Sequence, residues 1–159
     1  LKNLPLVDVA ILAAGYLLRL LYGGGVTGIA LSQWLCLTVI AISFYLGLGK
    51  RRGELAAGGD GRKVLKYYSE KFLGYNMYLC VALAVVFYAL WTVDSLTVSR
   101  AGGEQLVWTV PLVLLICMKY SLDIELGGDG DPVEVLLHDR LLLGLGILLG
   151  TVVFAVLYL

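Results

Sequence analysis

Five long apolar segments constrain the fold of this 159-residue chain more than any other feature of its sequence. A helix needs about 20 apolar residues to cross a bilayer, and its backbone polar groups must be satisfied internally in lipid. Apolar residues make up 60% of the chain and charged residues 15%, against about 45–50% and about 25% in soluble domains. The sequence therefore predicts an all-α integral membrane protein with five transmembrane helices, at about residues 6–22, 30–49, 72–93, 105–120 and 141–159.

Glycine and proline positions predict how these helices turn, bend and pack. Residues 23–25 are all glycine and predict a tight turn after the first helix, because glycine adopts positive φ without a steric penalty. Pro111 predicts a kink in the fourth helix, since proline removes a backbone hydrogen bond. Gly146 and Gly150 form a Gly-x-x-x-Gly pattern in the fifth helix, which is typical of close helix packing.

Charged residues are concentrated in two connections. Residues 50–71 hold seven of the twelve Lys and Arg residues, and residues 121–140 hold six of the twelve Asp and Glu residues. Basic residues beside membrane helices favour the cytoplasmic side, so both connections are predicted there, and the C-terminus outside. We therefore expect a multi-pass membrane protein with both charged connections on its cytoplasmic face. The balance of charge excludes a nucleic-acid-binding protein.

A charged cluster directly after the second apolar segment is the main candidate for a binding site. Lys50, Arg51 and Arg52 precede Glu54, and in a continuing helix Lys50 and Glu54 share a face. Two interpretations stay open. The cluster is either an anchor that sets membrane topology or a phosphate site, because arginine and lysine both bind phosphate oxygens.

Two charged residues inside the first segment also have two interpretations each. Arg19 lies about 20 Å along the helix axis from Leu6. Its side chain either extends to the outer headgroups beside Tyr22 or lines a polar cavity, since charges inside membranes are costly and usually functional. Asp8 either stabilises the positive end of the helix dipole or lines the same cavity.

Helix starts are predicted at two polar sites. Ser69 is expected to cap the third helix. Asp131, Pro132 and Glu134 are expected to start a short helix that ends at His138. Because His138 has no second ligand at a suitable spacing, the sequence does not predict a metal site there.

Short stretches along nearly the whole chain match one family in order. They are residues 1–8, 15–19, 32–35, 49–55, 68–73, 110–111, 130–134 and 136–140. In these stretches the chain resembles the UbiA-type membrane transferase superfamily, specifically its decaprenyl-phosphate phosphoribosyltransferase branch. The resemblance implies a nine-helix bundle around a cavity open to the cytoplasm and to lipid. Residues 1–159 would form the C-terminal five helices of that single domain.

The resemblance implies transfer of 5-phosphoribose from phosphoribosyl pyrophosphate to polyprenyl (decaprenyl) phosphate, with release of pyrophosphate, in the synthesis of cell-wall arabinan precursors. It implies that Lys50 and Arg51 bind phosphate oxygens and that Tyr68 hydrogen-bonds the donor. Arg19 would line the cavity. Glu54 would act as the catalytic carboxylate, which orients the cations, contacts ribose hydroxyls or assists the metal. Asp139 and Arg140 also match, and are expected to form a structural pair that holds the last loop.

The resemblance also implies Mg²⁺, which the family binds through an Asn-Asp-x-x-Asp-x-x-x-Asp motif. This chain lacks that motif, so no metal ligands are assigned in it. We expect a fragment that is inactive alone, with the motif supplied by missing N-terminal helices or by another chain. Two alternatives stay open: a UbiA-type prenyltransferase with an aromatic acceptor, and a non-catalytic membrane subunit or small transporter.

Overall fold

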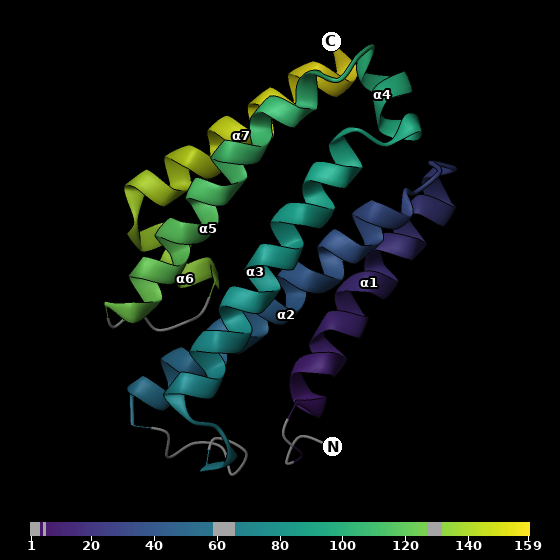
Figure 1. The fold of residues 1–159 in the computed structure, drawn as a ribbon. Helices are drawn as coiled ribbons and strands as arrows, with labels where there is room; N and C mark the ends of the chain where they lie inside the picture. Colours follow the sequence, from purple (N-terminus) through teal and green to yellow (C-terminus); the bar gives the residue numbers. More distant parts are fainter. Residues whose placement is uncertain (1–3, 5, 59–65, 127–131) are drawn as a thin grey trace.

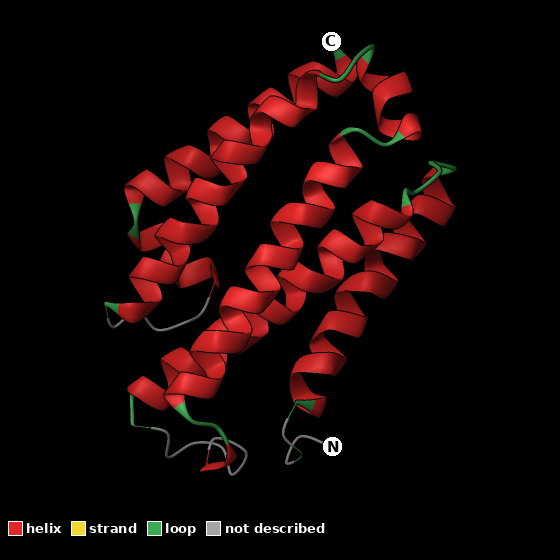
Figure 2. Cartoon of the chain, viewed as in Figure 1, coloured by secondary structure: helices red, strands yellow, loops and turns green. Residues whose placement is uncertain are grey.

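The computed structural model describes residues 4, 6–58, 66–126 and 132–159. Helices form all of the regular secondary structure in these residues, as Figure 2 shows. The elements in chain order are α1 (Val7–Thr27), α2 (Gln33–Ala56), α3 (Glu70–Thr92), α4 (Ser95–Ala101), the 3₁₀ helix η2 (Gln105–Thr109), α5 (Val110–Glu125), α6 (Pro132–His138) and α7 (Arg140–Tyr158).

Five helical segments are long and apolar enough to cross a membrane: α1, α2, α3, η2 with α5, and α7. This confirms the predicted all-α membrane protein with five spans. Large apolar side chains such as Leu18, Leu79 and Ile147 are exposed along these helices, as expected for surfaces that face lipid. The nine-helix bundle implied by the resemblance stays a prediction.

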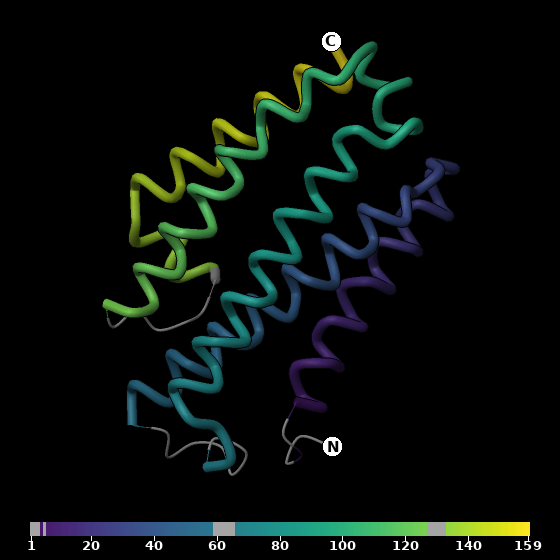
Figure 3. Tube along the Cα trace, in the orientation of Figure 1, coloured from purple at the N-terminus to yellow at the C-terminus, as the bar shows by residue number. Residues whose placement is uncertain are grey.

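The helices run up and down in two adjoining groups (Figure 1). The first group contains α1, α2 and α3, and the second contains α5, α6 and α7; the backbone trace shows the same arrangement (Figure 3). At one end of the bundle, α1 and α3 begin and α2 and α5 end. We call this the charged end, because described residues of both charged connections, such as Arg51, Glu70 and Asp123, lie there.

The α1 helix continues through residues 23–25, so the predicted tight turn at these glycines is wrong. The helix ends after Thr27, at Gly28, whose φ of 69° is left-handed. A Cβ atom on Gly24 would lie 2.8 Å or less from the Leu31 side chain. Glycine here therefore allows the following connection to fold back against the helix, without itself forming the turn.

The second span extends well past its predicted end. Ser32 caps α2, and its side chain accepts a hydrogen bond from the Trp34 N–H at 3.2 Å. The helix then continues to Ala56. Residues 50–54 are consequently helical, with side chains fixed at about 100° intervals around the axis.

Pro111 does not kink the middle of a helix, so that prediction is also wrong. It lies in the first turn of α5, where η2 changes to α-helix at Val110. Proline suits this position because its missing N–H would have no partner there. The α5 helix then runs to Glu125, so part of the predicted acidic connection is helical.

The two predicted helix starts are confirmed in the described residues. The Ser69 side chain accepts a hydrogen bond from the Phe72 N–H at 3.1 Å at the start of α3. The short α6 helix ends at His138, as predicted. The expected cap of α6, Asp131, lies outside the described residues.

Close helix packing predicted at Gly146 and Gly150 is not found among the described residues. A Cβ on Gly146 would contact only Leu136, at 4.0 Å, and one on Gly150 would have no neighbour within 4 Å. Small residues permit close approach, but the arrangement of the other helices decides whether an approach occurs.

The close contacts involve glycines of α2 instead. A Cβ on Gly47 would lie 2.8 Å from Val9 Cγ1 on α1, and Val9 is fully buried. A Cβ on Gly49 would lie 2.9 Å from Ile124 Cδ1 on α5 and 3.3 Å from Met77 Cε on α3. These two glycines therefore bring three helices against α2 near the charged end.

We predict that Gly47→Ala lowers the free energy of unfolding by about 1–3 kcal/mol, because the added methyl group overpacks the contact with Val9. Gly15→Ala is the matched control, since a Cβ there has no neighbour within 4 Å. It should raise the free energy by up to about 1 kcal/mol through helix propensity. Denaturant unfolding in detergent micelles measures both, and equal effects would contradict the packing argument.

Candidate functional site

Three consecutive basic residues at the end of α2 point in different directions. Lys50 lines a groove beside α1. Arg51 is buried, with 2% of its surface exposed. Arg52 reaches α5, where its Nη1 lies 3.3 Å from Glu125 Oε1. Because the sequence places them one after another on a helix, only the helix geometry separates their environments.

Arg51 is held between two carboxylates. Its Nε donates to Asp8 Oδ2 on α1 at 2.6 Å, and its Nη1 donates to Glu54 Oε2 at 2.7 Å. The side chains of Arg51 and Asp8 are 3% and 5% exposed, and that of Glu54 is 24% exposed. Breaking a pair this deeply buried leaves a charge without compensation.

Tyr68 completes this network from the segment before α3. Its hydroxyl donates to Asp8 Oδ1 at 3.1 Å and accepts from the Leu6 N–H at 2.6 Å. Burial raises the pKa of Tyr68, and the Asp8 charge adds to this, while the Leu6 N–H opposes it. The hydroxyl therefore stays protonated and able to donate to Asp8. We call Asp8, Arg51, Glu54 and Tyr68 the buried network.

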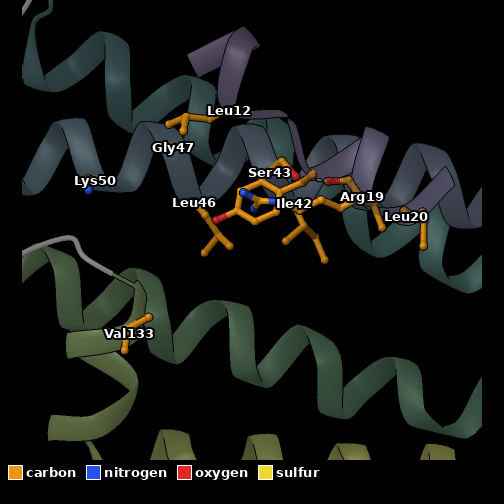
Figure 4. A pocket seen from close by; sticks show the side chains of 11 residues that line it. Leu12, Arg19, Leu20, Ile42, Ser43, Leu46, Gly47, Lys50 and Val133 are labelled. Atoms are coloured by element: carbon orange, nitrogen blue, oxygen red, sulfur yellow. Dashed lines mark hydrogen bonds between the residues drawn. The ribbon is translucent and has the colours of Figure 1, made fainter. Parts of the chain in front are cut away.

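A groove of about 620 Å³ runs between α1 and α2, with α6 at its edge. Figure 4 shows Lys50 near one end of the groove, opposite Val133, and Arg19 further along it. Apart from Arg19, Lys50, Tyr16 and Ser43, the lining consists of glycine and aliphatic side chains: Leu12, Leu20, Val39, Ile42, Leu46, Gly47 and Val133. The groove is thus apolar along its walls and cationic at two places.

Neither groove cation forms an ion pair with a carboxylate in the described part of the chain. The Arg19 guanidinium lies over the Tyr16 ring, with Cζ 5.5 Å from its centroid. Side chains on a helix lean toward its N-terminus, and Arg19 extends along the groove in the direction of Lys50 (Figure 4). This placement favours the interpretation that Arg19 lines a cavity over the interpretation that its side chain extends to the outer headgroups.

The structure therefore divides the predicted site residues into two sets. Lys50 and Arg19 share the groove, whereas Arg51, Glu54 and Tyr68 bond to one another or to Asp8. Asp8 lies in the first turn of α1 and does not line the groove, so of its two interpretations the structure favours the one at the helix start. Its partner could not be identified, because Arg51 lies 43 positions away in the sequence.

The sequence predicted an ion pair between Asp139 and Arg140, and this prediction is wrong because Asp139 has a different partner. Asp139 forms an ion pair with Lys119 of α5, and its Oδ1 accepts from the Leu141 N–H at 2.8 Å as the cap of α7. The Lys119 hydrogen bond lowers the pKa of Asp139 to about 2. An aspartate that caps a helix turns its carboxylate toward the first backbone N–H groups of that helix. In this position the carboxylate of Asp139 also lies beside Lys119 of α5.

The described residues do not fit a magnesium site. No group of three or more His, Cys, Asp or Glu side chains is suitably placed among them. Asp8 and Glu54 are already bonded to Arg51, and His138 Nδ1 lies 2.9 Å from the Glu134 carbonyl oxygen. No step involving a metal can therefore be derived from these residues.

Comparison with known proteins supports the resemblance seen in the sequence. The chain is 33% identical over 146 residues to the decaprenyl-phosphate phosphoribosyltransferase of Corynebacterium glutamicum, covering 89% of this chain and 44% of the relative. It is 31% identical over 152 residues to the enzyme of the same name from Mycolicibacterium smegmatis, covering 89% and 48%. The chain is homologous to these transferases.

The chain spans about half the length of the decaprenyl-phosphate phosphoribosyltransferases it matches. The relative from Mycobacterium tuberculosis, 31% identical over 146 residues, gives the same coverage of this chain and 47% of its own length. No protein-family model matches the chain.

We predict that Asp8→Ala lowers the free energy of unfolding by about 1.5–3 kcal/mol, because the buried Arg51 loses one of its two charged hydrogen-bond acceptors and keeps Glu54. Glu125→Gln is the control. It removes the partly exposed pair with Arg52 but keeps an acceptor for the Tyr78 hydroxyl, which now donates to Glu125 at 2.5 Å. Its effect should stay below about 1 kcal/mol. Unfolding in micelles compares the two, and similar losses would contradict the assigned difference in burial.

Proposed function

We propose that this chain forms the part of a membrane transferase that binds a lipid phosphate. The whole protein would transfer 5-phosphoribose from phosphoribosyl pyrophosphate to polyprenyl (decaprenyl) phosphate and release pyrophosphate. The observation that carries the proposal is the groove beside α1, with aliphatic walls and two cations that have no carboxylate partner in the described residues. The homologous proteins, which are decaprenyl-phosphate phosphoribosyltransferases, support the reaction.

The groove suits an isoprenoid chain that ends in a phosphate. Aliphatic side chains such as Leu12, Ile42 and Leu46 would contact the chain, and burial of apolar surface contributes roughly 25 cal/mol per Å². Lys50, at the charged end, would bind the phosphate as a compact charge with three donors. Arg19 would extend the positive potential along the groove and draw the anionic lipid into it.

The reaction needs positioning and charge more than a protein nucleophile. An oxygen of the acceptor phosphate forms a bond to the anomeric carbon of ribose, while the bond from that carbon to pyrophosphate breaks and its electron pair leaves with the pyrophosphate. Fixed cations stabilise the charge that develops on the leaving group. Lys50 would hold the acceptor phosphate in position for the attack.

The remaining predicted substrate contacts stay proposals. Glu54 has the most exposed side chain of the buried network, which suits a contact with ribose hydroxyls. Tyr68 would hydrogen-bond the donor, whereas Arg51, which was predicted to bind phosphate oxygens, is already bonded to Asp8 and Glu54. We also propose that the whole protein depends on Mg²⁺ for pyrophosphate departure, with ligands from sequence outside this chain.

Membrane placement follows from the same proposal. The charged end would face the cytoplasm, because basic residues favour that side, and phosphoribosyl pyrophosphate would reach Lys50 from there. The protein would lie in the plasma membrane and supply precursors for cell-wall arabinan. No described feature favours the aromatic-acceptor or transporter alternatives.

The test is an assay of phosphoribose transfer in membranes that contain the complete protein to which this chain belongs. We expect labelled phosphoribose from phosphoribosyl pyrophosphate to appear on decaprenyl phosphate. Lys50→Met should lower kcat/KM by about 10–100-fold, since a hydrogen bond to a charged group is worth about 1.5–3 kcal/mol. Arg52→Met, which removes the partly exposed pair with Glu125 and does not touch the groove, should stay within about threefold.

The two parts of the proposal fail separately. An unmodified protein that gives no phosphoribosyl lipid contradicts the proposed function. An active protein in which Lys50→Met and Arg52→Met behave alike contradicts the role of Lys50.

A further inference from the structure

We propose that Asp8 and Arg51 are positioning residues, which act through Lys50 and do not bind substrate themselves. Their buried ion pair would set the distance between α1 and α2 and the rotation of α2 at the charged end of the groove. The inference rests on the proposed function, because Lys50 is the residue that it positions.

The first observation is that Arg51 has little capacity left for a ligand. It bonds to Asp8 through Nε and to Glu54 through Nη1, and its side chain is 3% exposed. It does not line the groove, whereas its neighbour Lys50 does. One cation between two carboxylates also has no net positive charge to offer a phosphate.

The second observation is the place of the pair between the helices. Asp8 precedes Val9, and Val9 on α1 packs so closely against Gly47 on α2 that a Cβ there would lie 2.8 Å from Val9 Cγ1. Gly47 and Lys50 both line the groove. The ion pair therefore joins α1 to α2 within one helical turn of Lys50. Since Lys50 and Arg51 are adjacent on α2, a fixed Arg51 side chain fixes the direction in which Lys50 leaves the helix.

The third observation is that Asp8 is itself held on both oxygens. Oδ2 accepts from Arg51 and Oδ1 accepts from Tyr68. The Tyr68 hydroxyl also accepts from the N–H of Leu6, a non-glycine residue at a left-handed φ of 66°. Strained backbone persists only where neighbouring groups determine it, and it is concentrated at functional sites. The start of α1 is thus fixed in a conformation that the chain would not adopt alone.

The experiment compares single and paired replacements in the complete protein. Arg51→Met leaves the buried Asp8 carboxylate without its cation, and Asp8→Leu leaves Arg51 bonded to Glu54 but no longer to α1. Each should raise the KM for decaprenyl phosphate about tenfold or more, since a small displacement of a binding group is costly. The double variant D8L/R51M replaces the pair with apolar groups, which buried sites often accept. The double variant should bring the KM for decaprenyl phosphate most of the way back to that of the unmodified protein. In all three variants kcat should change less than the KM.

The variant Tyr45→Phe distinguishes a positioning role of Asp8 and Arg51 from a general contribution to stability. Tyr45 lies on the same helix, where its hydroxyl bonds to the Cys117 carbonyl and to Ser121 on α5, away from the groove. Its loss should lower the unfolding midpoint without changing the KM. If Tyr45→Phe raises the KM as much as the single variants do, the effect is one of general stability and the inference is wrong.

Two further outcomes decide the matter. If D8L/R51M binds decaprenyl phosphate as poorly as Arg51→Met, then Arg51 is itself a ligand and the inference is overturned. If the double variant does not fold, Tyr68→Phe takes its place, because it removes one bond to Asp8 and keeps every charge. A raised KM for decaprenyl phosphate then supports the inference, and an unchanged KM for decaprenyl phosphate overturns it. An unmodified protein without transfer activity would contradict the proposed function instead.

Discussion

The ion pair between Asp8 and Arg51 determines how the charged end of this bundle is assembled. Removing two charges from water is unfavourable unless each is paired and its remaining polar atoms are bonded. Arg51 meets this requirement through Asp8 and Glu54, and Asp8 meets it through Arg51 and Tyr68. These partners come from α1, from the last turns of α2 and from the segment before α3. Satisfying one buried pair therefore brings three parts of the chain together.

The same requirement separates the basic residues by role. Arg51 is fully engaged and Arg52 reaches Glu125 on α5. Lys50 and Arg19 line the apolar groove, where the described residues offer them no carboxylate partner. Charged side chains inside membrane helices are costly, and they commonly mark the path or binding site of a substrate or ion. This contrast, and not the number of basic residues, supports the assignment of a lipid phosphate to the groove.

Features that depend on local chemistry were predictable from the sequence. The five spans follow from hydropathy, and Ser69 caps α3 because its hydroxyl lies beside free backbone N–H groups. Features that need a partner were not. Gly146 and Gly150 permit close packing without requiring it, Pro111 suits a helix start as well as a kink, and Asp139 pairs with Lys119 although Arg140 is its neighbour. The positions of glycine, proline and charged residues limit which helix contacts, helix starts and ion pairs can form. The arrangement of the helices decides which of these do form.

The sequence by itself determined that this chain forms five membrane-spanning helices, that its charges gather at one end, and which transferases it resembles, because length, hydropathy and residue order carry that information. Only the tertiary structure decided that Lys50 faces the groove while Arg51 is buried against Asp8. Adjacent residues on a helix point about 100° apart, so their surroundings depend on which helices lie beside them. Those neighbours are set by contacts between residues distant in the chain, which no local pattern specifies.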